Sequence, residues 1–219
     1  MTIHNIDHIP FSFDAQLLCR GLRVKPGSRH AGRLDELAHQ AQDLARPKAA
    51  YVVPEPPVVD VEMVAIEGVG FKSRLLSDNL KHTRALFPFL ATCGREIESW
   101  ARQLTNPMEA FWADTLMTLA LAEAVKALEQ RLAPECGTHP LSCMNPGSLA
   151  DWPLTEQRPL FELMGAAPAT MGMDLSPECL ITPLKSVSGI YFLAEDQFIN
   201  CRLCPREHCP GRRAPRDAP

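Results

Sequence analysis

One long amphipathic segment, residues 106–132, constrains the fold of this chain more than any other part of the sequence. Asn106, Pro107 and Glu109 supply an N-cap, a proline at the first helical position and an acid in the first turn. We therefore expect a helix that begins here and ends at about Leu132, just before Pro134.

The residues of this helix form two apolar stripes on opposite sides of a helical projection. One contains Trp112, Leu116, Leu119 and Ala120, and the other contains Phe111, Met117, Leu121, Val125 and Leu128. A helix that is apolar on two faces is usually packed between two layers. Glu123 lies inside the first stripe and is a candidate buried acid. The alternative is a carboxylate at the edge of the stripe, exposed to water or paired with an arginine.

The rest of the chain consists of short segments, because 20 prolines interrupt it. Helices are expected at residues 14–22, 30–46, 78–86, 96–104 and 155–165, and strands at 51–53, 58–66, 87–92, 180–192 and 198–201. Residues 137–154 are expected to form a loop, and the chain beyond Pro210 a disordered tail. The irregular order of helices and strands predicts an α+β fold with a mixed, mainly antiparallel twisted sheet and the long helix sandwiched against it.

Charge and hydropathy exclude several classes of protein. The net charge of −4 argues against nucleic acid as a partner, because phosphate binding needs an excess of basic residues. No segment approaches the roughly 20 apolar residues that cross a bilayer, and the first residues do not resemble a signal peptide. We expect a cytoplasmic protein with no membrane partner. In that compartment, eight cysteines are expected to be thiols or metal ligands rather than disulfides.

Three of these cysteines, Cys201, Cys204 and Cys209, lie within nine residues. Thiolates at this spacing can converge on one soft metal centre, and the neighbouring arginines would lower their pKa values. Three cysteines with an open position would suit a 4Fe–4S cluster. A fourth ligand, such as Cys143, Cys179 or His208, would complete a zinc site. Free or redox-active thiols are the alternative, and would make the chain a redox sensor.

Two stretches in the second half of the chain form a recognisable pair. Residues 145–157 read Asn-Pro-Gly-Ser-Leu-Ala-Asp-Trp-Pro-Leu-Thr-Glu-Gln and run into Leu-Phe-Glu-Leu-Met-Gly at 160–165, and residues 186–192 read Ser-Val-Ser-Gly-Ile-Tyr-Phe. Together with the long helix before them, they resemble the activation domain of vitamin B12-dependent methionine synthase, in the same order and at similar separations. The region before Gly94 also resembles standalone relatives of that domain.

The resemblance implies an S-adenosylmethionine site and a partner that carries cobalamin. In that family, the domain presents the methyl group of S-adenosylmethionine to a cobalamin in the inactive Co(II) state, and reduction coupled to methylation restores methylcobalamin. The protein supplies binding and orientation, and the cofactors carry the chemistry. The resemblance also implies the division of the chain. Residues 1–93 would form an N-terminal α/β region that packs on the main domain, 94–201 the activation-domain-like core, and 201–219 the cysteine motif and tail.

The resemblance also implies which residues bind the ligand. Tyr191 matches a ligand-contacting tyrosine, Glu123 an acid near the methyl donor, and Gly147 a loop glycine that lets a ligand approach the backbone. The other implied cofactor-binding positions are Pro146, Ser148, Asp151, Ser188 and Gly189. Without the resemblance, Pro146 and Gly147 read as a plain turn, and Ser188 and Gly189 as a bulge in a strand.

The chain departs from the family at two positions of this loop. The family has an arginine where this chain has Cys143, and a tyrosine where it has Ser148. A cysteine cannot form the bidentate pair that an arginine makes with a carboxylate.

Two functions are therefore expected. One is reactivation of a cobalamin (corrinoid) cofactor of a partner methionine synthase, or of a related corrinoid methyltransferase, by reductive methylation with S-adenosylmethionine. In that case an iron–sulfur cluster at the cysteine motif would be an internal source of electrons. The other, favoured by Cys143 and Ser148, is a non-catalytic adaptor that binds a metal or an iron–sulfur cluster and docks on a corrinoid protein.

Overall fold

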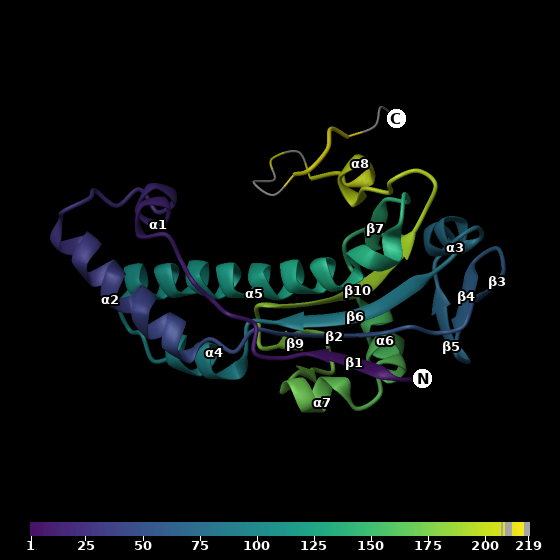
Figure 1. Cartoon of the computed structure of the whole chain (residues 1–219), viewed down its shortest axis with the longest axis horizontal. Helices are drawn as coiled ribbons and strands as arrows, with labels where there is room; N and C mark the ends of the chain where they lie inside the picture. The colour runs from purple at the N-terminus through teal and green to yellow at the C-terminus, as the bar shows by residue number, and fades with distance from the viewer. Residues whose placement is uncertain (207, 209–211, 217–219) are drawn as a thin grey trace.

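A five-stranded antiparallel sheet forms the centre of the molecule (Figure 1). The structure is a computed structural model, and it describes residues 1–206, 208 and 212–216. In spatial order, the strands are β1 (Ile3–Ile6), β2 (Lys48–Val52), β6 (Leu86–Thr92), β10 (Ser186–Leu193) and β7 (Leu141–Met144). Every pair of neighbours in this sheet is antiparallel. Strands from residues 1–93 and strands from residues 94–201 therefore share one sheet.

The two central strands are apolar over most of their length. β6 is buried at all seven positions, and β10 is buried from Ser188 to Leu193. They pair in continuous register from Ser186–Thr92 to Phe192–Leu86. Strands that are buried on both faces need layers of other elements above and below them.

The long helix α5 (Pro107–Cys136) covers one face of the sheet and extends beyond it (Figure 1). Its N-cap is Asn106, whose side chain accepts hydrogen bonds from the backbone N–H groups of Met108 and Glu109. Its first half packs on α2 (Arg29–Leu44) and α4 (Arg95–Ala101), and its second half packs on the sheet. The predicted α+β class and the long helix packed between other elements are confirmed.

The buried residues explain this arrangement. Trp112 and Leu116 join a core with Leu37 of α2 and Ile97 of α4. Further along α5, Ala124, Leu128 and Leu132 face a second core with the side chains of Phe87, Phe89 and Tyr191. The two predicted stripes are confirmed only in part, because Met117 of the second stripe joins the same core as Trp112 of the first, and Phe111 and Leu119 are exposed.

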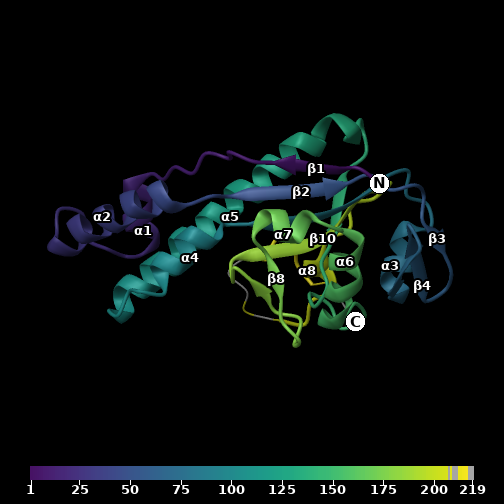
Figure 2. The same ribbon diagram turned by 90° about the horizontal axis from the view of Figure 1, so that it is seen from below.

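The helices α6 (Gln157–Leu163) and α7 (Ala167–Met171) cover the opposite face of the sheet, as the view from below shows (Figure 2). The helix α3 (Arg74–Leu80) and a small sheet of β3 (Val58–Val59), β4 (Met63–Ile66) and β5 (Val69–Lys72) lie at one end of the molecule (Figure 2). Trp152, Phe71 and, from β10, Phe192 are fully buried in one core shared by these elements. The remaining elements are α1 (Ala15–Gly21), a 3-10 helix (Leu154–Glu156), β8 (Asp174–Leu175), β9 (Ile181–Thr182) and α8 (Asn200–Leu203).

Several expected boundaries are wrong. α5 does not end near Leu132 but continues to Cys136, because Pro134 lies in its last turn and removes only one intrahelical bond there. The helix expected at 78–86 is α3, which begins earlier because Ser73 caps it. Residues 198–201 are not a strand, and α8 begins at Asn200. β7 lies within the expected loop at 137–154. In the described part of the chain, no helix is both long and apolar enough to cross a membrane.

Candidate functional site

A hollow of about 470 Å³ lies between the second half of α5, the β10–β7 side of the sheet and the C-terminal segment, which we define as described residues 197–206, 208 and 212–216. We call it the Tyr191 hollow. Its polar and sulfur-bearing lining residues are Glu129, Cys143, Asn145, Tyr191, Gln197, Asn200, Cys201 and Arg213. A volume in this range suits a small-molecule ligand.

Tyr191 is fixed within this hollow from two sides. Its hydroxyl donates a hydrogen bond to Oε1 of Glu129 on α5, across 2.8 Å. Its ring stacks on Phe89 of β6, with the ring centroids 4.5 Å apart. Burial, together with the neighbouring Cys143 and Glu129, raises the pKa of Tyr191 above its ordinary value. The hydroxyl is therefore neutral at physiological pH and acts as a hydrogen-bond donor.

Cys143 lies directly opposite Tyr191 on β7. Burial raises the pKa of its thiol to about 12, and the carboxylate of Glu129 adds to this effect. Its Sγ lies 3.6 Å from Oδ1 of Asn145. A thiol with this pKa stays protonated near neutral pH, so Cys143 is a weak nucleophile.

Cys201, which lines the same hollow, has the opposite electrostatics. The backbone N–H of Arg213 donates to its Sγ at 3.3 Å. This hydrogen bond lowers the pKa of Cys201, and the charges of Arg212 and Arg213 contribute in the same direction. Cys201 is thus the more readily ionised thiol of the two.

No family model and no curated protein matches the sequence. Among thirteen matching chains of solved structures is the crystal structure of the MetH reactivation domain bound to AdoHcy. The TM-score is 0.60 at 15% sequence identity, over 91% of this chain and 80% of that chain. This chain has the fold of the MetH reactivation domain. The fold implied by the sequence resemblance is confirmed.

The implied site residues of β10 are divided between the two faces of the sheet. Side chains alternate along a strand, so Tyr191 faces α5 while Ser188 faces the opposite layer. Ser188 is buried there, and its hydroxyl donates to Oε1 of Gln157 on α6 across 3.1 Å. Of these side chains, Tyr191 lines the hollow.

Gly189 permits the close approach of β7 to β10. A Cβ at this position would lie 2.5 Å from both the carbonyl oxygen of Met144 and Nδ2 of Asn145. Nδ2 of Asn145 donates instead to the carbonyl of Ser188, across 2.8 Å. The pairing with β6 is continuous through Ser188 and Gly189, so the interpretation of these residues as a bulge is wrong.

The backbone N–H groups of the Pro146–Gly147 loop form hydrogen bonds within the loop itself. The N–H of Gly147 donates to the carbonyl of Trp152 at 2.7 Å, and the N–H of Ser148 donates to the carbonyl of Asn145 at 3.1 Å. Gly147 has a φ of +82°, and a Cβ on it would lie 2.9 Å from Cδ1 of Leu154. Both amides are therefore engaged within the loop.

Asp151 connects this loop to α3. Its carboxylate accepts hydrogen bonds from the hydroxyl of Ser73 and the backbone N–H of Leu75. Pro146 is buried, whereas Ser148 and Asp151 are exposed. The contacts of Asp151 thus fix the start of a helix on the small-sheet side of the molecule.

Glu123 lies away from Tyr191. Its side chain is 35% exposed, and its carboxylate lies 3.5 Å from Nζ of Lys126. It lines a different hollow, between α1 and α5, together with Phe111 and Leu119. Glu123 is therefore a carboxylate at the edge of the stripe rather than a buried acid.

The acid that reaches Tyr191 is Glu129, which the sequence analysis did not identify. It lies four residues after Val125, so both side chains are on one face of α5 and line the same hollow. The sequence signal that could have identified Glu129 is its position one helical turn after Val125, a residue of the second apolar stripe.

The cysteine motif is described only in part. Cys201 lies in α8 and Cys204 directly follows it, and both are half-buried thiols. Cys209 lies outside the described residues. Within the described ranges, no three His, Cys, Asp or Glu side chains are grouped to hold a metal ion. The metal site at Cys201, Cys204 and Cys209 remains a prediction.

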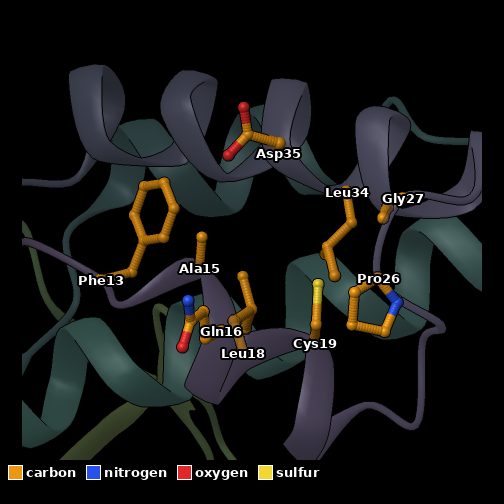
Figure 3. A pocket seen from close by; sticks show the side chains of 10 residues that line it. Phe13, Ala15, Gln16, Leu18, Cys19, Pro26, Gly27, Leu34 and Asp35 are labelled. Atoms are coloured by element: carbon orange, nitrogen blue, oxygen red, sulfur yellow. The ribbon is translucent and has the colours of Figure 1, made fainter.

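A smaller hollow of about 220 Å³ lies between α1 and α2 (Figure 3). Phe13, Leu18 and Leu34 are among its apolar lining residues, and Cys19 contributes a thiol. This hollow is smaller than typical cofactor sites, which are about 300–1,000 Å³. The Tyr191 hollow is the better candidate site.

Proposed function

We propose that this chain binds S-adenosylmethionine in the Tyr191 hollow and serves in the reactivation of a corrinoid cofactor on a partner protein. The partner would be a cobalamin-binding methionine synthase or a related corrinoid methyltransferase. The observation that carries the proposal is the Tyr191–Glu129 hydrogen bond within a hollow of suitable size, in a fold shared with a solved structure that is bound to AdoHcy.

The chemistry of the hollow fits this ligand. The carboxylate of Glu129 suits the positive charge of a sulfonium, and the rings of Phe89 and Tyr191 give an aromatic surface beside it. Oδ1 of Asn200 is buried and has no hydrogen-bond partner among the described residues. A buried acceptor of this kind is stabilised when a ligand brings an N–H or O–H donor to it.

The roles of the residues follow from these properties. S-adenosylmethionine would supply the methyl group and leave as S-adenosylhomocysteine, and the corrinoid on the partner would accept the methyl group after a one-electron donor protein has reduced its cobalt from Co(II) to Co(I). Glu129 and Tyr191 would orient the ligand, since their hydrogen bond holds the carboxylate toward the hollow. The C-terminal segment would limit access of water on the side of Asn200 and Cys201.

Titration calorimetry of the anaerobically purified chain with S-adenosylmethionine tests the proposal. Binding in the micromolar range is expected, and Tyr191→Ala should abolish it. Phe111→Ala is the control. Phe111 is also aromatic, but it is 61% exposed and lines a different hollow. Absence of binding by the unaltered chain would contradict the proposal.

A metal- or cluster-binding adaptor that docks on a corrinoid protein is the second candidate. The observation in its favour is Cys201, whose lowered pKa makes it a better metal ligand than an ordinary thiol, with Cys204 three residues away. Iron and zinc analysis of anaerobically purified chain tests it, with Cys201→Ser and Cys204→Ser as variants. Stoichiometric metal that both variants lose, together with no binding of S-adenosylmethionine, would favour the adaptor.

A further inference from the structure

Two polar side chains of the C-terminal segment, Asn200 and Arg213, line the Tyr191 hollow. Oδ1 of Asn200 is a buried acceptor that no described residue satisfies. Among the described residues, the one hydrogen bond of Arg213 is made by its backbone N–H, to Sγ of Cys201. One acceptor and one cationic group therefore remain available to a ligand in the same hollow.

Arg213 lines the hollow together with Cys143 and Tyr191, and it belongs to the C-terminal segment, whereas the other two lie on β7 and β10. Its side chain is exposed to solvent.

The C-terminal segment is attached to the rest of the domain by specific contacts. The backbone N–H of Phe198 donates to the hydroxyl of Ser142 on β7, across 2.9 Å. Nη1 of Arg212 donates to the carbonyl of Cys201, across 2.8 Å. The first bond attaches the residues around Asn200 to β7, and the second attaches the neighbour of Arg213 to α8. Asn200 and Arg213 are therefore positioned before a ligand arrives.

We propose that Asn200 and Arg213 form a subsite for the zwitterionic amino-acid end of the ligand. The guanidinium of Arg213 would hold the carboxylate by charge-assisted hydrogen bonds, and Oδ1 of Asn200 would accept a hydrogen bond from the ammonium group. This subsite rests on the proposed function, since it concerns the same hollow. It adds that the amino-acid end of the ligand points toward the C-terminal segment, and the sulfur toward Glu129.

Calorimetry with two ligands tests the subsite on the full chain. AdoHcy carries the amino-acid end, and 5′-methylthioadenosine has the same nucleoside and a thioether but lacks that end. Arg213→Ala should weaken AdoHcy binding by about 10- to 100-fold, as expected for loss of a charge-assisted pair, and leave 5′-methylthioadenosine unchanged. Asn200→Ala should act in the same direction with a smaller effect.

Two variants control for charge and folding. Arg216→Ala removes the same charge from an arginine of the same segment that is exposed, as Arg213 is, but does not line the hollow, so both affinities should stay unchanged. Arg213→Lys should recover part of the AdoHcy affinity, because a lysine keeps the charge but not the bidentate geometry. Thermal unfolding of each variant confirms that the domain is intact.

The outcomes separate the subsite from the proposed function. If Arg213→Ala binds AdoHcy as tightly as the unaltered chain, or loses both ligands equally, the subsite is wrong and the proposed function stands. If the unaltered chain binds neither ligand, both proposals are wrong. Loss confined to AdoHcy, in Arg213→Ala and not in Arg216→Ala, supports the subsite.

Discussion

The hydroxyl of Tyr191 and Oε1 of Glu129, 2.8 Å apart, join the central strand β10 to the second half of α5. The bond connects two elements that the fold already packs together, and it leaves a carboxylate at the edge of a hollow. A carboxylate held in this way has a fixed direction, which is the property that a site for a cationic ligand needs.

Glu129→Gln should distinguish a cationic ligand from a neutral one. The amide keeps the shape and an acceptor for Tyr191, but it removes the negative charge. S-adenosylmethionine carries a sulfonium and AdoHcy does not, so the affinity for the first should fall about fivefold more than for the second, which corresponds to roughly 1 kcal/mol of charge attraction. Calorimetry with both ligands measures this difference.

Glu123→Gln is the control for this comparison. It removes the same charge from the same helix, at a residue that lines a different hollow. Equal effects of the two substitutions on the affinity for S-adenosylmethionine would contradict the role of Glu129.

Gly189→Ala should destabilise the domain. The new Cβ would meet the backbone oxygen of Met144 at 2.5 Å, and the two strands would have to move apart. Overpacking of this kind costs about 1–3 kcal/mol or more, measurable by urea unfolding. Gly32→Ala is the opposite case, because nothing lies within 4 Å of its Cβ in α2, and it should stabilise the domain by about 0.5–1 kcal/mol. Unchanged stability of Gly189→Ala would contradict the strand geometry.

Alkaline pH should weaken the fold through Cys93. Burial raises the pKa of this thiol from an ordinary 9.0 to about 12, and the carboxylate of Glu98 adds to the rise. Below pH 9 both states keep the proton. Between about pH 9 and 12 the unfolded chain loses a proton that the folded chain retains, so the free energy of unfolding falls with pH. The expected slope from one such thiol is about 1.4 kcal/mol per pH unit.

Urea unfolding at several pH values measures this slope, and Cys93→Ala should reduce it. A variant with the same slope as the unaltered chain would show that Cys93 does not contribute.

Asp151→Ala should affect stability and leave ligand binding unchanged. The carboxylate accepts hydrogen bonds from Ser73 and Leu75 at the start of α3, and its loss should cost about 1–2 kcal/mol. The AdoHcy affinity should stay within twofold of the unaltered chain (roughly 0.4 kcal/mol). A large loss of affinity in a stably folded variant would place Asp151 among the ligand-binding residues instead.

Local signals explain which elements could be predicted from sequence. The start of α5 is determined by Asn106 and Pro107, which act within one turn of the helix. The start of α3 depends in addition on Asp151, which is distant in sequence. β7, which reads Leu-Ser-Cys-Met, has no β-branched residue, and it becomes a strand through its pairing with β10.

The candidate site was harder to predict for the same reason. The resemblance identified Tyr191, but the choice between Glu123 and Glu129 depends on where the sheet lies beneath α5. The hollow itself combines residues from Phe89 to Arg213, and no short motif contains them. Gly189 was interpreted as part of a bulge, which is wrong, because the close approach of β7 that requires a glycine there becomes visible only in the structure.

The stacking of Tyr191 on Phe89 has a consequence for how the hollow comes into being. The two rings lie on neighbouring central strands, roughly 100 residues apart in the chain, so their contact forms only when one of the most non-local pairings of the domain has closed. The amide hydrogens of β10, bonded to strands on both sides, should then exchange with deuterated water only when the whole domain unfolds. The stacked pair beside the hollow would thus arise and disappear together with the global fold, whereas the C-terminal segment, which also lines the hollow, is held by separate contacts.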